Sequence, residues 1–235
     1  MSSRDELHAL MIALLRERVK EGRIADVGCG DGTLARLLRA PGYTVFCCDF
    51  AGVHGEREGL AHVRADLRTG LPWKTGSLKG AVCSEVLEHL LEPARAIKEL
   101  SRVLAPGGVL VLSVPNYWNL HHRFRYLLTG SLQRCYCKDV ALTGTHEDVC
   151  LPHVNTATFE TYSYVLRRNG LAVEHVRGAN DGGVLRVIPY ALLGAGVKVA
   201  NIFRSNKRTG DHSEVNAWPT LLGRHVCLVC RKAAP

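Results

Sequence analysis

The sequence predicts an α/β protein built on a doubly wound parallel sheet, and three observations carry that prediction. Residues 23–32, Arg-Ile-Ala-Asp-Val-Gly-Cys-Gly-Asp-Gly, form a short apolar run that breaks into a glycine turn and then a helical pattern. Further apolar runs alternate with helical patterns as far as Pro115. Acidic residues follow several of these runs, where the strand ends of such a sheet share one crevice.

The elements follow in regular order up to Pro115. Apolar residues at helical spacing predict a helix over residues 5–20, and Pro106-Gly107-Gly108 is expected to turn the chain into the fifth strand. We expect strands over residues 24–27, 44–50, 61–67, 80–86 and 109–114, with helices over 33–39 and 88–104. Beyond Pro115 we expect a helix over 117–128, a loop over 129–155, a helix over 157–169, and strands over 171–176 and 224–231.

Composition indicates a single globular domain, residues 1–235, that can bury a sizeable core. The start is polar and no apolar run is long enough for a membrane span. Nine cysteines without a secretory leader favour a reducing compartment, so we expect the cytoplasm. The net charge of +8 is scattered, which favours a solvated basic surface, and no DNA partner is expected. Oligomeric state and the role of residues 185–223 stay open.

Two groups of cysteines are predicted to be structural. Cys47, Cys48 and Cys83 fall in expected strands as small core residues. Cys227 and Cys230 form a C-x-x-C pair, but within a strand their side chains would point to opposite faces, which makes a poor chelate.

The glycine turn and the acids predict a cofactor site. Asp49, Asp66 and Glu85 end successive expected strands, and an acid in the position of Asp49 can accept both hydroxyls of a ribose. These features serve a nicotinamide dinucleotide and other adenosine cofactors equally. However, Asp31 would repel a pyrophosphate at the helix start, and Gly32 follows Gly30 by two positions instead of three. A cofactor with no phosphate and a positive centre fits better.

The motif Asp-Val-Gly-Cys-Gly-Asp-Gly, residues 26–32, resembles the first motif of class I methyltransferases that use S-adenosylmethionine. The match continues through Asp49, Ala65-Asp66-Leu67, Glu-Val-Leu-Glu-His-Leu at 85–90, and residues 104–116, and covers about 21–176. Residues 224–231 fit that family's last, antiparallel strand. The chain also resembles small-molecule methyltransferases of the ubiquinone-biosynthesis type. The resemblance implies a seven-stranded, mostly parallel Rossmann-like sheet and S-adenosylhomocysteine as product.

The same resemblance implies roles for individual residues. Asp26, Gly28, Cys29 and Gly30 would hold the methionine part of the cofactor, and Asp49 with Phe50 the ribose. Asp66 would bind the adenine amino group beside the Leu67 backbone, and Ser84 and Glu85 would close over the sulfonium. The alternative for Asp66 is a helix or turn cap, and for Glu85 a solvated strand end.

His89 and His153 are the candidate catalytic residues, because both fall on the crevice side of the family pattern. A candidate metal-binding set is also present, made of Glu85, Glu88 and His89 with a later histidine. With His153 as that histidine, the set resembles the metal-dependent methyltransferases of small-RNA 3′ ends. With His146, it resembles those of ubiquinone biosynthesis. The same residues occur in relatives without metal, so a divalent ion is not part of the prediction. A cluster of Cys135, Cys137, His146, Cys150 and His153 fits no standard zinc finger.

We therefore expect an S-adenosylmethionine-dependent methyltransferase acting on a small molecule at oxygen, with residues 115–157 as acceptor-binding cap. The residues expected to line an aromatic acceptor there are Tyr117, Trp118, His121, His122 and Tyr126. One alternative is a metal-assisted RNA 2′-O-methyltransferase, favoured by the positive charge. The other is a cofactor-binding partner protein without catalysis.

Overall fold

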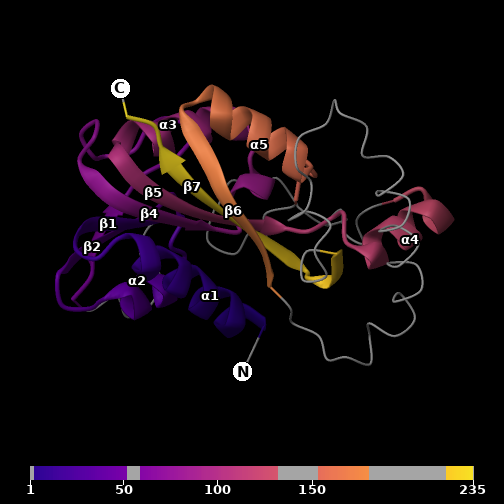
Figure 1. The fold of residues 1–235 in the computed structure, drawn as a ribbon, viewed down its shortest axis with the longest axis horizontal. Coiled ribbons are helices and arrows are strands. Elements are labelled where there is room, and N and C mark those ends of the chain that lie inside the picture. Colours follow the sequence, from indigo (N-terminus) through magenta and orange to yellow (C-terminus); the bar gives the residue numbers. More distant parts are fainter. Residues whose placement is uncertain (1–2, 52–58, 132–152, 180–220, 235) are drawn as a thin grey trace.

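A seven-stranded sheet organises the computed structural model, which describes residues 3–51, 59–131, 153–179 and 221–234. The strands lie in the order β3-β2-β1-β4-β5-β7-β6 (Figure 1). β1 to β5 pair in parallel, whereas β7 runs antiparallel to both of its neighbours. The strand bounds are β1 Gly22–Val27, β2 Tyr43–Asp49, β3 Ala61–Arg64, β4 Leu78–Ser84, β5 Leu104–Pro115, β6 Leu171–Ala179 and β7 His225–Lys232. The predicted doubly wound sheet with an antiparallel last strand is confirmed.

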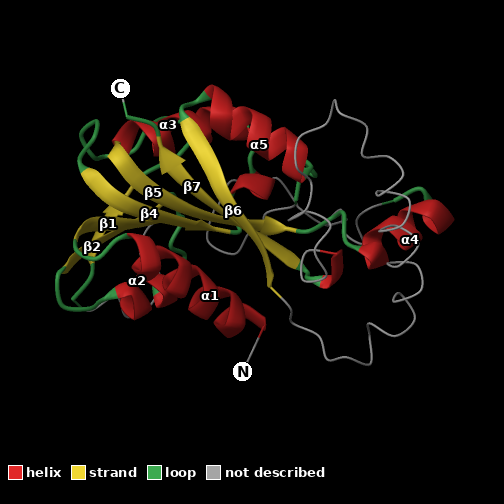
Figure 2. Ribbon diagram, in the orientation of Figure 1, coloured by secondary structure: helices red, strands yellow, loops and turns green. Residues whose placement is uncertain are grey.

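Helices cover both faces of this sheet (Figure 2). α1 and α2 pack on one face, and α3 and α5 on the other, while α4 extends beyond the end of the sheet. The bounds are α1 Ser3–Arg18, α2 Thr33–Leu38, α3 Pro93–Val103, α4 Leu120–Thr129 and α5 Phe159–Arg168, with a short 3₁₀ turn at Leu87–His89. Among the described residues, no helix is both long enough and apolar enough to cross a membrane.

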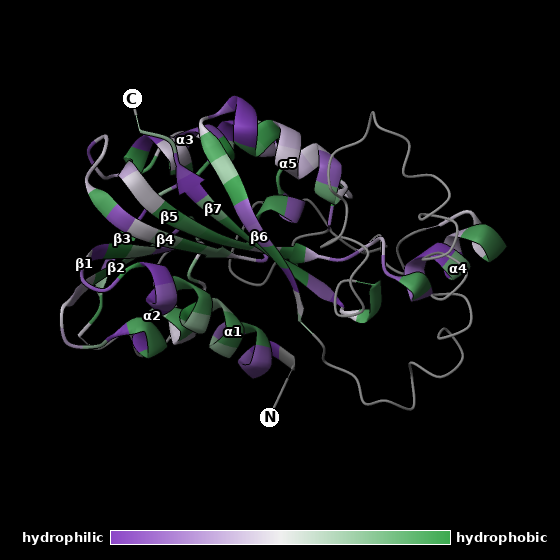
Figure 3. Cartoon of the chain, in the orientation of Figure 1, coloured by the Kyte–Doolittle hydropathy of each residue, from purple (hydrophilic) through white to green (hydrophobic). Residues whose placement is uncertain are grey.

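The core consists of two apolar layers separated by the sheet. Leu15, Met11 and Leu38 are fully buried on the α1–α2 side, and Ile97, Leu100 and others on the α3–α5 side. The central residues of β4 (80–83) and β5 (109–114) are buried and mostly hydrophobic (Figure 3), because both faces of these strands are covered. This two-sided burial leaves the carboxyl ends of the strands as the edge at which polar residues gather.

The predicted helix over 88–104 is wrong in its first part. Leu90 is extended (φ −100°, ψ 133°) and separates the short turn at residues 87–89 from α3. The cause is Pro93, the first residue of α3, since a proline suits a helix start and disfavours helical backbone at the residue before it. Glu92 accordingly has φ −120° and ψ 69°.

Other predicted boundaries shift by a few residues for local reasons. β3 ends at Arg64, and Asp66 then forms a turn in which its carboxylate accepts from the Arg68 N–H (2.8 Å). The Pro106-Gly107-Gly108 segment does not precede β5 but forms a bulge within it. α4 begins after Asn119, whose side chain accepts from the His122 N–H and caps the helix.

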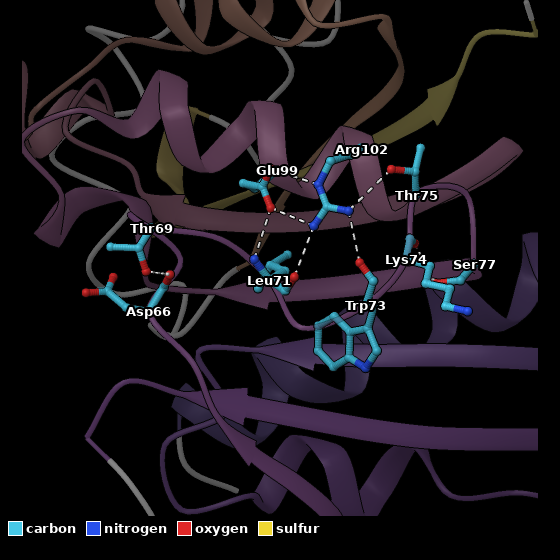
Figure 4. Close-up of polar contacts among 9 residues, drawn as sticks. All are labelled: Asp66, Thr69, Leu71, Trp73, Lys74, Thr75, Ser77, Glu99 and Arg102. Carbon is cyan, nitrogen blue, oxygen red and sulfur yellow. Dashed lines mark hydrogen bonds and ion pairs between the residues drawn. The ribbon is translucent and has the colours of Figure 1, made fainter.

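The connection between β3 and β4 is fixed to α3 by one charged pair, drawn in Figure 4. Glu99 and Arg102 form an ion pair at 2.8 Å, and Arg102 also donates to the carbonyls of Leu71 and Trp73. Glu99 accepts from the Leu71 N–H (3.0 Å). These bonds hold the segment that carries Asp66 against the body of the domain.

The predicted structural cysteines are confirmed. Cys47, Cys48 and Cys83 are buried in β2 and β4, and all six cysteines among the described residues are free thiols. Cys227 and Cys230 lie in opposite core layers, so they do not form a chelate.

Candidate active site

A glycine turn follows β1 and is locked onto the end of β2. The Gly28 N–H donates to the Cys48 carbonyl (2.8 Å), and the Gly30 N–H donates to Asp49 Oδ2 (2.9 Å). Gly28 has φ 74°, and a Cβ there would lie 2.3 Å from Val86 Cγ2. Only glycine therefore fits at this position.

This turn borders a cavity of about 610 Å³, here called the strand-end cavity. Its volume lies within the usual range for small-molecule sites. The predicted residues that line it are Asp26, Gly28, Cys29, Gly30, Ser84 and Glu85. The residues that the sequence reasoning missed are Arg4, Leu7, His8, Leu34 and His225. They come from α1, α2 and β7, and only the packing of these elements brings them there.

Asp26 is a buried acid in the wall of the strand-end cavity. Its side chain is 1% exposed, and Oδ2 has no hydrogen-bond partner among the described residues. Burial, followed by the neighbouring Cys47, raises the pKa of Asp26 to about 8. A cationic ligand group would relieve the cost of ionising this carboxyl.

Glu85 lies at the next strand end in a left-handed conformation (φ 53°), which is uncommon for a residue with a side chain. Ser113 Oγ donates to Glu85 Oε1 (2.9 Å) and lies 3.1 Å from Ser84 Oγ. His225 Nε2 lies 3.4 Å from Glu85 Oε2. The backbone and these contacts direct the carboxylate along the cavity wall.

The other predicted cofactor residues lie near the strand-end cavity without lining it. Asp49 holds the chain with both oxygens, since Oδ1 accepts from the Ala51 N–H (2.9 Å) and Oδ2 from Gly30. Phe50 follows directly. The Asp66 carboxylate is engaged by Arg68 (2.7 Å), and the Leu67 side chain packs into the core.

A second group, the Glu88–His89–His153 cluster, brings the two predicted catalytic histidines together. The potential ligand atoms of these three side chains lie within 4.8 Å of one another, and the histidine rings meet edge-on with centroids 4.8 Å apart. The Glu88 carbonyl accepts from the Val154 and Asn155 N–H groups (both 2.9 Å). These two bonds attach the segment that carries His153 to the short 3₁₀ turn, Leu87–His89, that follows β4.

Glu88 is the buried member of this cluster, at 1% exposure. Neither carboxylate oxygen has a hydrogen-bond partner among the described residues, and His89 Nε2 lies 3.8 Å away. Burial, followed by the nearby charge of Glu85, raises the pKa of Glu88 well above its usual range. A buried carboxyl in this state is either protonated or compensated by a cation.

His153 is oriented by Tyr117, whose hydroxyl shares a hydrogen bond with Nδ1. Burial lowers the pKa of His153, with smaller contributions from His89 and His225. The imidazole is therefore neutral near pH 7. In the tautomer in which Nδ1 donates to the Tyr117 oxygen, the ring electron pair lies on Nε2, the atom that can take a proton or bind a cation.

Not every sequence-predicted residue joins these sites. Glu85, considered as a fourth metal ligand, is directed toward Ser113 and His225 instead of the cluster. Tyr117 is buried, whereas Tyr126 is 53% exposed. The calls on His146, Cys135, Cys137 and Cys150, and most of 185–223, lie outside the described residues.

The family model described as "Methyltransferase domain" matches residues 3–176. The chain belongs to this methyltransferase family. It is 33% identical over 118 residues to the probable S-adenosylmethionine-dependent methyltransferase of Mycolicibacterium smegmatis, covering 46% of this chain and 44% of the relative. It is 34% identical over 106 residues to the ubiquinone biosynthesis O-methyltransferase of Xanthomonas oryzae, covering 40% and 43%. The chain thus matches less than half the length of these curated relatives.

Solved structures of methyltransferases share the fold. An S-adenosylmethionine-dependent methyltransferase from Mesorhizobium loti superposes with a TM-score of 0.55 at 20% identity, covering 95% of this chain and 96% of that one. A Thermotoga maritima S-adenosylmethionine-dependent methyltransferase superposes with a TM-score of 0.57 at 15% identity, covering 96% and 89%. The resemblance inferred from the sequence motifs is therefore confirmed at the level of family and fold.

Proposed function

We propose that this methyltransferase-family chain transfers a methyl group from S-adenosylmethionine to a hydroxyl oxygen of a small-molecule acceptor. The observation that carries the proposal is the strand-end cavity with two carboxyls, Asp26 and Glu85, in its wall. A ligand with an ammonium and a sulfonium and no phosphate suits such a cavity. Asp26, with its unpartnered Oδ2, fits the ammonium. The name of the Xanthomonas relative supports oxygen as the methylated atom.

The assignments of the cofactor-binding residues are part of the proposal. Asp26 and the backbone from Gly28 through Cys29 to Gly30 would hold the methionine part, and Ser84 and Glu85 the side near the sulfonium. Asp49 and Phe50 would bind the ribose, and Asp66 and Leu67 the adenine. When bound, the cofactor supplies an activated methyl group, so the chain has to orient the acceptor and remove its proton.

His153 is the proposed base, and His89 lies beside it. With Nδ1 held by Tyr117, the Nε2 electron pair of His153 can accept the proton that leaves the acceptor hydroxyl. The lowered pKa leaves His153 unprotonated before the reaction. We further propose that residues 1–235 form one domain, with helix 1–22 at its start and residues 115–157 as the acceptor-binding cap. A cytoplasmic location is supported by the free cysteines.

Calorimetric titration tests this proposal directly. We expect S-adenosylhomocysteine and S-adenosylmethionine to bind with micromolar affinity and NAD not to bind. Release of labelled methyl groups to an extract fraction would then separate an enzyme from a cofactor-binding partner protein without catalysis. Folded protein that binds neither adenosyl ligand would contradict both readings.

We propose metal-assisted RNA 2′-O-methylation as the second candidate function, because one observation favours it. Glu88, His89 and His153 offer one carboxylate and two imidazole ligands, and the buried Glu88 carboxylate lacks a hydrogen-bond partner among the described residues. This donor set fits a divalent cation. These three residues would hold the ion, which when bound supplies Lewis acidity at an acceptor hydroxyl.

Titration with Mn²⁺, followed by electron paramagnetic resonance, separates the two candidates independently of activity. Tight binding that is lost in Glu88→Gln, together with methylation of a short RNA with free 2′-hydroxyls, would favour the second candidate. Absence of Mn²⁺ binding by the wild-type protein would leave the metal-independent reaction at His153.

A further inference from the structure

A second pocket, here called the aromatic pocket, lies on the α5 side of the sheet end. Its volume is about 190 Å³, and it shares no residue with the strand-end cavity. The two open on different faces, because His225 of β7 lines the strand-end cavity whereas Val226 and Leu228 line the aromatic pocket. The rings in its wall belong to Tyr117, Trp118, Phe159 and Tyr162.

The aromatic pocket is also lined by a cation, Arg123, which has no ion-pair partner among the described residues. Arg123 is half-buried, and its Nε donates to the Trp118 carbonyl (2.6 Å), which fixes the guanidinium. No carboxylate of the described residues forms an ion pair with it. Glu160 also lines the pocket and interacts with Arg123 only at longer range. The remaining guanidinium N–H groups are thus available to an anion.

Tyr162 also lines the aromatic pocket. Tyr162 is 2% exposed, and none of the described residues forms a hydrogen bond with its hydroxyl. Burial raises the pKa of Tyr162, with smaller contributions from the nearby Glu88 and Tyr117. A polar group of a ligand in the pocket can hydrogen-bond to this hydroxyl.

We propose that the aromatic pocket binds a small aromatic carboxylate that carries a hydroxyl substituent. Arg123 binds the carboxylate, and the ring lies among Tyr117, Phe159 and Trp118. The Tyr162 hydroxyl, which lines the same pocket, binds the hydroxyl substituent of the ligand. A cavity of about 150 Å³ holds benzene, so the aromatic pocket has room for one ring.

Ligand binding measured without turnover tests this proposal. Saturation-transfer NMR and calorimetry would compare 4-hydroxybenzoate, benzoate, benzamide and benzylamine on protein with and without S-adenosylhomocysteine. We expect both carboxylates to bind more tightly than the neutral amide and the amine, and 4-hydroxybenzoate to bind more tightly than benzoate. Arg123→Gln should weaken carboxylate binding by about tenfold or more, because a charge-assisted bond is lost.

Three variants sharpen the result. Arg125→Gln is the matched control, since Arg125 lies on the same helix but does not line the aromatic pocket, and should change affinity by less than about twofold. Glu160→Gln should strengthen carboxylate binding by removing a like charge. Tyr162→Phe should abolish the preference for 4-hydroxybenzoate over benzoate. If Arg123→Gln does not fold, Arg123→Lys keeps the charge and loses the forked geometry.

Equal binding of benzamide and benzoate, or equal effects of Arg123→Gln and Arg125→Gln, would overturn the proposal, as would the absence of any carboxylate binding. Failure of the proposed function has a different signature. In that case S-adenosylhomocysteine would not bind to folded protein, while the carboxylates would still bind through Arg123.

Discussion

The strand-end cavity and the Glu88–His89–His153 cluster are neighbouring sites that are assembled in different ways. At the centre of the cavity, the glycine turn is fixed by bonds between consecutive strand ends, such as Gly30 to Asp49. The cluster joins residues 88–89 to residue 153 through the bonds of Val154 and Asn155 to the Glu88 carbonyl. A change at the turn should therefore disturb the fold and cofactor binding together, whereas a change in the cluster should act on chemistry alone.

The largest loss of stability and of cofactor binding is expected at Gly28, in the glycine turn. Gly28→Val would place a side chain within 2.3 Å of Val86 Cγ2 at a positive φ. We expect a loss of stability on the order of 3 kcal/mol and no measurable binding of S-adenosylhomocysteine. Urea unfolding and calorimetry check both.

Gly30→Ala is the matched control for this experiment. Gly30 also has a positive φ (50°), but a Cβ there meets nothing within 4 Å. Gly30→Ala should lower the free energy of unfolding by only about 1 kcal/mol, the cost of placing a side chain at positive φ. Equal destabilisation by both variants would show that steric contact with Val86 is not what requires glycine at position 28.

His153→Ala should show the opposite behaviour. Removing the base should lower turnover by about a hundredfold, and the affinity for S-adenosylhomocysteine should stay within about twofold of wild type. Tyr117→Phe should lower turnover less, because the imidazole loses only its orienting partner. Steady-state kinetics with a methyl acceptor, together with calorimetry, separates these effects. A loss of cofactor binding in His153→Ala would contradict the prediction that the cluster affects turnover without affecting cofactor binding.

Features set by local sequence could be predicted, whereas features set by the packing of distant elements could not. Apolar alternation and the glycine motif are local, so the strand order along the chain, the turn and the buried cysteines were predictable. The helix over 88–104 was wrong because helical spacing continued through Pro93, whose ring ends such a helix. Arg4 and His8 of α1 were missed as cavity residues, because their position depends on how Met11 and Leu15 pack under the sheet.

The protonation state of Asp26 gives a further test of the strand-end cavity. With a pKa of about 8 it is mostly protonated at pH 7, and binding of a cationic ligand should ionise it. Binding of S-adenosylhomocysteine at pH 7 should therefore release up to about one proton, measured by calorimetry in buffers of different ionisation enthalpy. Asp26→Asn should abolish the release and weaken binding by about tenfold.

The same carboxyl predicts how stability depends on pH. Its pKa is higher in the folded protein than in the unfolded chain, so the folded state holds more protons between about pH 4 and pH 8. The stabilising contribution is complete below this window and is lost as pH rises through about 8. In urea unfolding, Asp26→Asn should flatten that decline. An unchanged slope would mean that Asp26 ionises without penalty.

The smallest effect is expected at Asp66, and its comparison with Asp49 tests which acids serve the ligand. Asp49 Oδ2 anchors the glycine turn through Gly30, and Oδ1 accepts from the Ala51 N–H. Asp49→Ala should therefore weaken S-adenosylhomocysteine binding by about tenfold or more. The Asp66 carboxylate is already engaged by Arg68, and adenine would have to share it, so Asp66→Ala should weaken binding only about threefold. Arg68→Gln frees the carboxylate and should strengthen binding slightly if Asp66 meets the adenine amino group. Unchanged affinity in Arg68→Gln would instead mean that Asp66 only stabilises its own turn. A carboxylate that contacts the local backbone and not the ligand cannot bind the ligand more strongly when its ion pair with Arg68 is removed.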